Sequence, residues 1–158
     1  MNPALIEGFT VVGIEARTGN VREMAGTGII AKQWARFIGE NLLAQIPNRS
    51  DGAILAVYSD YEGDKDGEYS FMIGARVKAA LGIPAGMIAR KIPAGQYAVF
   101  TSERGPVEKI VVETWQKIWS ATNAELGGQR AYSADFEIYD ERARDPKNAQ
   151  VDIYVAVK

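Results

Sequence analysis

The chain contains no cysteine and no histidine among its 158 residues. Their absence excludes cysteine nucleophiles, Ser-His-Asp triads, histidine proton shuttles and zinc sites of the usual Cys/His type. Without cysteine there is also no disulfide framework, which is consistent with a cytoplasmic location. Any chemistry must come from Asp, Glu, Tyr or Lys side chains or from a bound ligand. We therefore expect no metal ion and no cofactor, and we assign no catalytic residue.

The chain also lacks a strong charge of either sign and any long apolar run. Eighteen basic residues stand against twenty acidic ones, which gives a net charge of −2 and no electrostatic reason to expect nucleic-acid binding. No apolar run approaches the roughly 18 residues that span a membrane, and the first residues do not resemble a signal peptide. We predict a single cytoplasmic domain over residues 1–158, with no direct contact to nucleic acid or membrane.

The pattern of apolar residues predicts alternating strands and helices. Ile30, Trp34, Ile38 and Leu42 recur every four residues, which predicts a helix over residues 27–44. A second helix is expected to begin after Pro106, since proline is favoured in the first helical turn. Runs of β-branched and aromatic residues predict strands at 9–17, 53–61, 68–77, 96–102, 130–139 and 151–158, with a connector over 79–95.

This order is strand–helix–strand–strand, written twice. Trp34 and Trp115 occupy matching places in the two predicted helices and lie 81 residues apart, close to half the chain. We predict an α+β fold of two repeats, about residues 5–80 and 90–158, related by a pseudo-twofold axis. The antiparallel sheet should carry the helices on one face and a ligand pocket on the other.

The stretch SADFEIYDE, residues 133–141, combines a carboxylate and an aromatic residue on one side of a strand. Side chains alternate along a strand, so Asp135, Glu137 and Tyr139 share one face and the apolar residues between them share the other. A carboxylate among aromatic rings is costly unless a cation pairs with it, and the rings themselves attract cations. The alternative is a solvated sheet face on which Glu137 is an ordinary exposed residue.

The last strand supplies further candidates. If the purely apolar rows pack on the helices, Asp152 and Tyr154 lie on the same open face as Glu137 and Tyr139. Repeat symmetry then matches Phe71 with Tyr154 and places Tyr58 nearby. The helical spacing of Trp34, Trp115 and Trp119 is typical of core residues, and it also suits a pocket wall.

Several long motifs extend over nearly the whole chain: NVREMAGTGIIAKQWARF (20–37), IPNRSDGAILAVYSDYEGDKDGEYSFMIGARV (46–77), IPAGQYAVFTSERGP (92–106) and ETWQKIWS (113–120). They resemble the integron-cassette effector-binding proteins. That family belongs to the gyrase-inhibitor-like, or AraC-type, effector-binding domain superfamily, which includes ligand-binding domains of multidrug-responsive transcription regulators. The "DFEIY" strand and the terminal "VDIYVAV" strand are similar to the superfamily.

The resemblance implies a central pocket in which a glutamate anchors cationic, lipophilic compounds. The matching residue is Glu137, and the family's aromatic pocket positions correspond to Tyr58, Trp115 and Tyr154, with Asp152 as a second acid. Symmetry and spacing add Trp34, Phe71, Trp119 and Tyr139. The related regulators carry a DNA-binding module beside this domain, whereas here the domain fills the sequence, so we expect no direct DNA binding.

Three functions are compatible with these residues. The first is a stand-alone protein that binds cationic amphipathic compounds such as drugs. The second is a hydrolase of reactive electrophiles, in which Glu137 acts as a base with Tyr139 or Tyr154 as donor. The third is a ligand-sensing module that acts in trans on a separate regulator protein. The sequence does not indicate the oligomeric state.

Two local patterns look like ligand loops and do not fit their context. GTGIIA (26–31) has the form of a dinucleotide fingerprint but does not follow a strand directly. DYEGDKDGE (60–68) has the early spacing of a calcium loop, but Ile73 occupies the closing position. We interpret them as the start of a helix and a hairpin turn.

Overall fold

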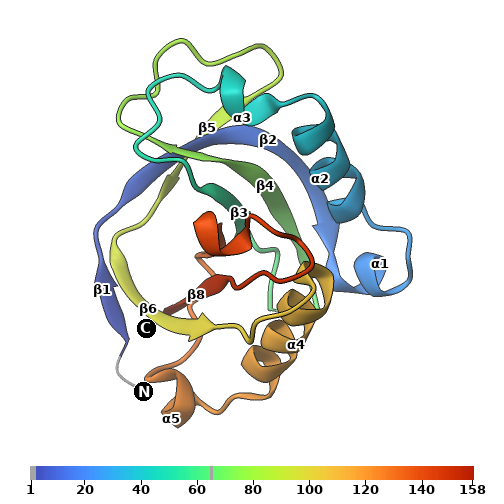
Figure 1. Cartoon of the computed structure of the whole chain (residues 1–158). Coiled ribbons are helices and arrows are strands. Elements are labelled where there is room, and N and C mark those ends of the chain that lie inside the picture. Colours follow the sequence, from blue (N-terminus) through green and yellow to red (C-terminus); the bar gives the residue numbers. More distant parts are fainter. Residues whose placement is uncertain (1–2, 65) are drawn as a thin grey trace.

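A computed structural model describes residues 3–64 and 66–158, and its framework is one curled antiparallel sheet of eight strands (Figure 1). All neighbouring strands are antiparallel, in the order β1-β6-β8-β7-β3-β4-β2-β5. The strands are β1 Ala4–Ile6, β2 Phe9–Gly19, β3 Ile54–Ser59, β4 Glu68–Val77, β5 Ile88–Ile92, β6 Gly95–Thr101, β7 Ala134–Tyr139 and β8 Asp152–Val157.

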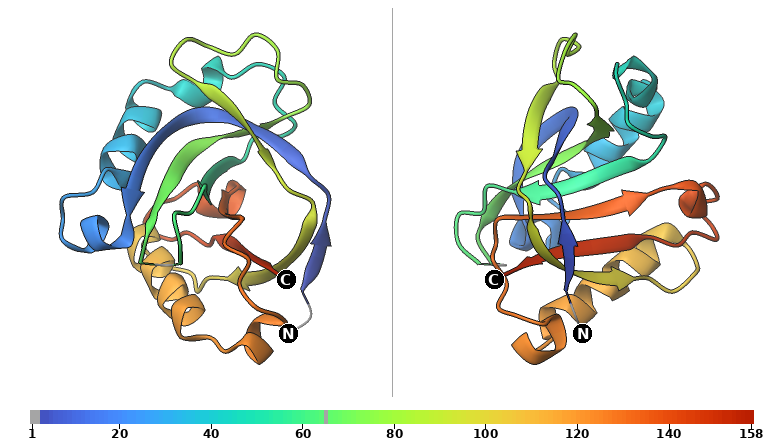
Figure 2. Two further views of the ribbon diagram at one scale, coloured as in Figure 1. Left: turned by 180° about the vertical axis from the view of Figure 1, so that it is seen from behind. Right: turned by 90° about the vertical axis from the view of Figure 1, so that its left-hand side faces the viewer.

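The two longer helices pack on the same face of this sheet. Figures 1 and 2 show α2 and α4 on one side of the curl, with the sheet's opposite face turned toward its own interior. No helix within residues 3–64 and 66–158 is long and apolar enough to cross a membrane. The helices are α1 Asn20–Met24, α2 Ile30–Gly39, α3 Leu42–Gln45, α4 Val107–Ser120, α5 Asn123–Leu126 and the 3₁₀ turn η1 Glu141–Ala143.

Each face of the sheet has its own hydrophobic core. Under α2 the core includes Phe37 and Phe71, and under α4 it includes Ile118 and Ile153. The opposite face encloses a third cluster around Phe136. Because α2 and α4 cover separate parts of the sheet, side chains between them have neighbours from both helices.

A close approach of β2 and β4 lets the sheet curl tightly. Gly13 lies opposite Gly74 in the register of these strands. A Cβ atom on Gly13 would overlap the backbone of Ile73, and one on Gly74 would overlap the backbone of Val12. Only glycine permits so short a distance between β2 and β4. Glycine usually destabilises a strand, but at these two positions it allows the sheet to curl.

The predicted elements are mostly found, with differences at their ends. The strand predicted at 68–77 is observed with these bounds as β4. The helix predicted over 27–44 is interrupted: α2 ends at Gly39, and Asn41 adopts a left-handed conformation with φ 51° before α3 begins. The connector predicted over 79–95 contains β5. The α+β class is confirmed, whereas strand order alone does not establish an internal repeat, which stays a prediction.

The prediction that Asp152 and Tyr154 share a sheet face with Glu137 is wrong. Glu137 lies directly opposite Ile153 in the β7–β8 register, whereas Tyr154 lies opposite Phe136. Alternation within each strand was predicted correctly, but the relation between neighbouring strands depends on their register. The row that contains Glu137 therefore faces the helices.

Candidate ligand-binding site

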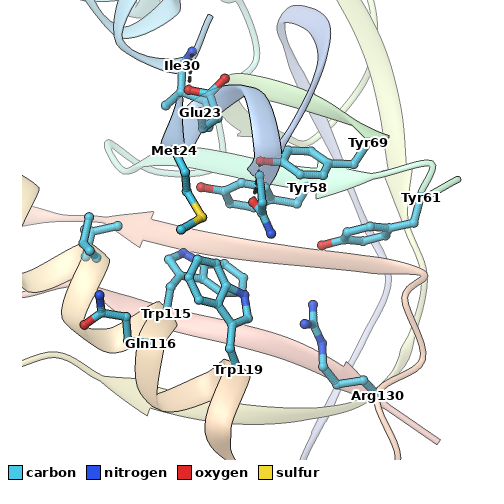
Figure 3. A pocket seen from close by; sticks show the side chains of 13 residues that line it. Glu23, Met24, Ile30, Tyr58, Tyr61, Tyr69, Trp115, Gln116, Trp119 and Arg130 are labelled. Atoms are coloured by element: carbon cyan, nitrogen blue, oxygen red, sulfur yellow. Dashed lines mark hydrogen bonds between the residues drawn. The ribbon is translucent and has the colours of Figure 1, made fainter. Parts of the chain in front are cut away.

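A cavity of about 490 Å³ opens between α1, α4 and the adjoining ends of β3 and β4, a volume within the usual range for small-molecule sites. On the face away from the helices, where the sequence predicts the pocket, a hollow of about 530 Å³ is lined in part by Asp152 and Tyr154. The cavity between α1 and α4 lies instead on the face that the helices cover (Figure 3). Its lining residues are Asn20, Glu23, Met24, Ile30, Tyr58, Tyr61, Tyr69, Val111, Val112, Trp115, Gln116, Trp119 and Arg130.

Aromatic rings form much of the cavity wall, and Tyr58 is at their centre. Its ring centroid lies 5.1 Å from that of Trp115 and 5.3 Å from that of Tyr69, both in edge-to-face geometry. Trp119 follows Trp115 by one helical turn of α4, so both indoles project from the same side of the helix. The wall is therefore apolar and rich in π faces, a surface that suits a flat or bulky organic cation.

A buried carboxylate lies directly behind this wall. Glu137 is 1% exposed. Its Oε2 accepts hydrogen bonds from Tyr58 Oη and Trp115 Nε1, both at 2.7 Å, and its Oε1 accepts one from Tyr139 Oη at 2.5 Å. Glu137 is not itself part of the cavity wall, so its negative charge reaches the cavity through Tyr58 and Trp115.

Burial raises the pKa of Glu137 above the usual range of a glutamate, although the hydrogen bonds from Tyr139, Trp115 and Tyr58 act in the opposite direction. Burial and the adjacent Glu137 carboxylate also raise the pKa values of Tyr58 and Tyr139 well above the ordinary value of tyrosine. Both phenols therefore remain protonated donors at neutral pH, and the carboxylate is the group in this cluster that can titrate.

A second buried charge, paired with a cation, stands at another side of the cavity. Asp135 is fully buried. Its Oδ2 accepts from Arg130 Nη2 at 2.6 Å and from Tyr61 Oη at 2.5 Å, and its Oδ1 accepts from the backbone N–H of Ala156 at 2.9 Å. Burial acts to lower the pKa of Arg130, but Asp135 and Tyr61 more than offset this effect, so the pKa is raised and the guanidinium stays charged.

Glu23 of α1 holds the other side of the cavity by capping α2. Its Oε2 accepts from Thr18 Oγ1 at 2.5 Å and from the Ile29 N–H at 2.8 Å, and its Oε1 lies 3.4 Å from the Ile30 nitrogen. The first N–H groups of a helix have no intrahelical partner, and a carboxylate there also complements the helix dipole. The short helix α1 is thereby tied to α2.

Gly28 leaves the space in which this carboxylate fits, so Gly28→Ala should destabilise the protein. An added Cβ would overlap the Glu23 carboxylate, and displacing a helix cap costs about 1 kcal/mol in free energy of unfolding. Gly39→Ala is the matched control, because an added Cβ meets nothing within 4 Å there; we expect it to be neutral or slightly stabilising. Urea unfolding of both variants tests this, and equal stabilities would contradict it.

The predicted site residues fall into three groups. Tyr58, Trp115 and Trp119 line the cavity, while Glu137, Tyr139 and Phe71 lie behind its wall. Trp34 packs in the core under α2 with its ring 4.7 Å from that of Tyr139. Asp152 and Tyr154 are on the opposite face, where Asp152 pairs with Arg142 and Tyr154 stacks on Phe136 at 4.8 Å.

Sequence reasoning missed most of the lining residues, including Tyr69 on β4 and Gln116 on α4. Asn20, Glu23 and Met24 belong to α1, a helix of five residues whose pattern is too short to recognise. Asp135 could have been found, because it shares a row with Glu137. No side-chain periodicity in the sequence places Arg130 near the cavity. Within residues 3–64 and 66–158, no group of three acidic side chains is placed to hold a metal ion.

The curled antiparallel sheet, with helices on one face and an aromatic cavity between them, makes an α+β domain with room for a small molecule. The model of the family described as integron-associated effector binding protein matches residues 5–157. The chain belongs to this family.

Named relatives and solved structures agree with this assignment. A putative transcriptional regulator protein of Bacillus subtilis, YobU, is 38% identical over 147 residues, which cover 92% of this chain and 90% of the relative. The integron cassette protein from the mobile metagenome of Vibrio cholerae is 27% identical, with a TM-score of 0.76 over 99% of this chain and 95% of its own. SAV2435, solved bound to tetraphenylphosphonium, is 22% identical, with a TM-score of 0.78 over 98% of this chain and 92% of its own. The likeness to YobU relates the chain to a protein named as a putative transcriptional regulator, and the likeness to SAV2435 shows a shared fold.

Proposed function

We propose that this protein binds lipophilic organic cations in the cavity between α1 and α4. The observation that carries the proposal is the Glu137 carboxylate, buried behind the rings of Tyr58 and Trp115 that form the cavity wall. A charge in a low-dielectric setting acts over a longer distance than one in water. A cation in the cavity is therefore attracted without direct contact with the carboxylate.

The two rings transmit this attraction. Tyr58 and Trp115 each donate a hydrogen bond to Glu137 Oε2. Donation to a carboxylate polarises the donor, which makes the attached ring more electron-rich. The faces of these rings then bind a cation more strongly than isolated aromatic side chains would. Drug-like cations with aromatic or bulky substituents also gain from burying apolar surface here.

The same geometry favours an anchor over a catalytic base. A general base must contact the group it deprotonates directly or through one water molecule. Both oxygens of Glu137 already accept hydrogen bonds, and its side chain does not line the cavity. An electrostatic anchor has no such contact requirement. Binding of tetraphenylphosphonium by SAV2435, which shares the fold, supports the class of ligand.

The test is a titration of the protein with tetraphenylphosphonium and with its neutral isostere tetraphenylmethane, which has no acceptor atom, followed by tryptophan fluorescence. We expect saturable quenching by the cation and none by the neutral compound. Affinity should fall as the pH is lowered, because protonation removes the Glu137 charge, and the fall should begin at a higher pH than for an ordinary glutamate because burial raises this pKa. Above that pKa the affinity should reach a plateau.

The chain has no histidine, so no imidazole titrates in the same pH range. Glu137→Gln is the control for the pH dependence, since its residual binding should not change with acidification. Equal binding of the neutral compound and the cation would refute a charge-selective cavity.

A further inference from the structure

Arg130 has more hydrogen-bond donors than the surrounding protein uses. The residue is 9% exposed and lines the cavity. Its guanidinium carries five N–H donors, and Nη2 donates to Asp135. Its Nε is buried and has no hydrogen-bond partner within the part of the chain that the structure describes. An unpaired buried donor is costly. Because the protein covers this Nε, a ligand oxygen in the cavity meets the guanidinium through the terminal N–H groups that Asp135 does not use.

The aromatic contacts of Arg130 leave the in-plane N–H groups of its guanidinium free of stacking partners. Its guanidinium lies 4.3 Å from the ring centroid of Tyr132 and 6.0 Å from that of Trp115. Stacking on an aromatic ring uses the face of the guanidinium, whereas its hydrogen-bond donors lie in the plane. Figure 3 shows the group pointing into the space between Trp119 and Tyr61. Asp135 also accepts hydrogen bonds from Tyr61 and from the Ala156 N–H, so it does not need a second hydrogen bond from Arg130.

We propose that Arg130 is a second polar anchor that binds an anionic or carbonyl oxygen of the ligand. The inference rests on the proposed function and narrows its ligand class to cations that also carry an acceptor oxygen, zwitterions above all. Trp115 separates the two anchors: its Nε1 donates to Glu137, and its ring faces Arg130. The ligand's cationic end lies over Tyr58 and Trp115, and its oxygen reaches toward Tyr61 and Arg130.

A matched pair of probes tests this ligand class. Carboxybutyl(triphenyl)phosphonium and pentyl(triphenyl)phosphonium share the cationic end and the chain length, and they differ in the terminal carboxylate. Dissociation constants are measured by calorimetry at a pH where the carboxylate is ionised. In the wild-type protein we expect the carboxylate probe to bind about tenfold or more tightly, as a charge-assisted hydrogen bond implies.

Two variants assign this preference to Arg130. Arg130→Lys keeps a positive charge beside Asp135 but loses the planar fork, and the double variant Arg130→Met/Asp135→Asn removes the pair without leaving a lone buried charge. In both we expect the ratio of the two affinities to fall to about one or below. A ratio that survives in both variants overturns the assignment.

The outcomes separate this inference from the proposed function. If the pentyl probe binds and the carboxylate probe binds no better, the protein is a cation-binding protein without a second anchor, and the inference is wrong. If neither probe binds, the proposed function is wrong and this inference fails with it. Tighter binding of the carboxylate probe, abolished in both variants, supports both.

Discussion

Glu137→Gln is expected to weaken the binding of tetraphenylphosphonium by about 1–3 kcal/mol, the value of an interaction with a desolvated charge. The amide has nearly the same shape as the carboxylate, and its oxygen can still accept from Tyr58 and Trp115, which donate to the same oxygen in the wild type. The cavity therefore keeps its walls and loses its negative charge. Calorimetric titration of the two proteins measures the difference directly.

The same substitution should stabilise the protein when no ligand is bound. A carboxyl group whose pKa is raised by folding binds more protons in the folded state, so stability falls as the pH rises through the interval between the ordinary and the raised pKa. Glutamine carries no such cost. We expect the variant to melt at a higher temperature than the wild type at neutral pH, with the difference closing on acidification.

Glu113→Gln is the matched control, because it makes the same change in net charge at an exposed position of α4. It should change neither cation affinity nor its pH dependence appreciably, since exposed charges are screened by solvent. Equal affinities of wild type and Glu137→Gln would remove the proposed anchor. A variant that binds less and is also less stable would indicate that Glu137 serves the fold.

The Glu137 carboxylate is expected to strengthen cation binding and to lower the stability of the ligand-free protein, which indicates a role in binding and not in folding. An amide or an apolar side chain would be easier to bury among Tyr58, Trp115 and Tyr139. A protein that keeps a carboxylate there carries a folding cost that a bound cation offsets, because the cation lowers the raised pKa of Glu137. Ligand binding and proton release are then linked below that pKa.

The sequence predicts the elements of the fold better than their relations. Alternation along residues 134–139 correctly places Asp135, Glu137 and Tyr139 in one row, because the side-chain period of a strand is a local property. Whether that row faces helices or solvent depends on the pairing of Glu137 with Ile153, which is set by contacts between distant segments. The assumption that purely apolar rows pack on the helices therefore placed Glu137 on the face opposite to the one it occupies.

The sequence predicts those site residues that lie in a periodic strand or helix or that match a motif of the family. Tyr58 and Trp115 lie on a strand and a long helix, whose periods identify their faces, and the resemblance assigned Glu137. Arg130 lies just before β7, outside any regular element apart from an isolated bridge to Val157, so no periodicity reports its direction. Its pairing with Asp135 is visible only once the chain is folded.

That buried pair leads to the largest stability effects we expect. Asp135 is 0% exposed and Arg130 9%, and removing one member of such a pair leaves an uncompensated charge in the interior, at a cost of about 3–5 kcal/mol. Asp135→Asn and Arg130→Met should each lower the free energy of unfolding by an amount in this range. Urea unfolding, analysed with a common slope, provides the measurement.

The double variant Arg130→Met/Asp135→Asn should lose less than the sum of the two single losses, because neither lone charge remains. A coupling energy of about 1 kcal/mol or more would show that the ion pair itself matters, and the coupling rises toward the sum of the two single losses as the double variant approaches the wild type. Strictly additive losses would instead mean that each side chain acts through separate contacts, Asp135 through Tyr61 and the Ala156 N–H, and Arg130 through its stacking on Tyr132.

Replacing a buried ion pair with well-packed neutral residues often changes the free energy of unfolding very little. A double variant close to wild type in stability would therefore mean that the fold does not require this buried pair, which is the result expected if Arg130 is retained to contact a ligand.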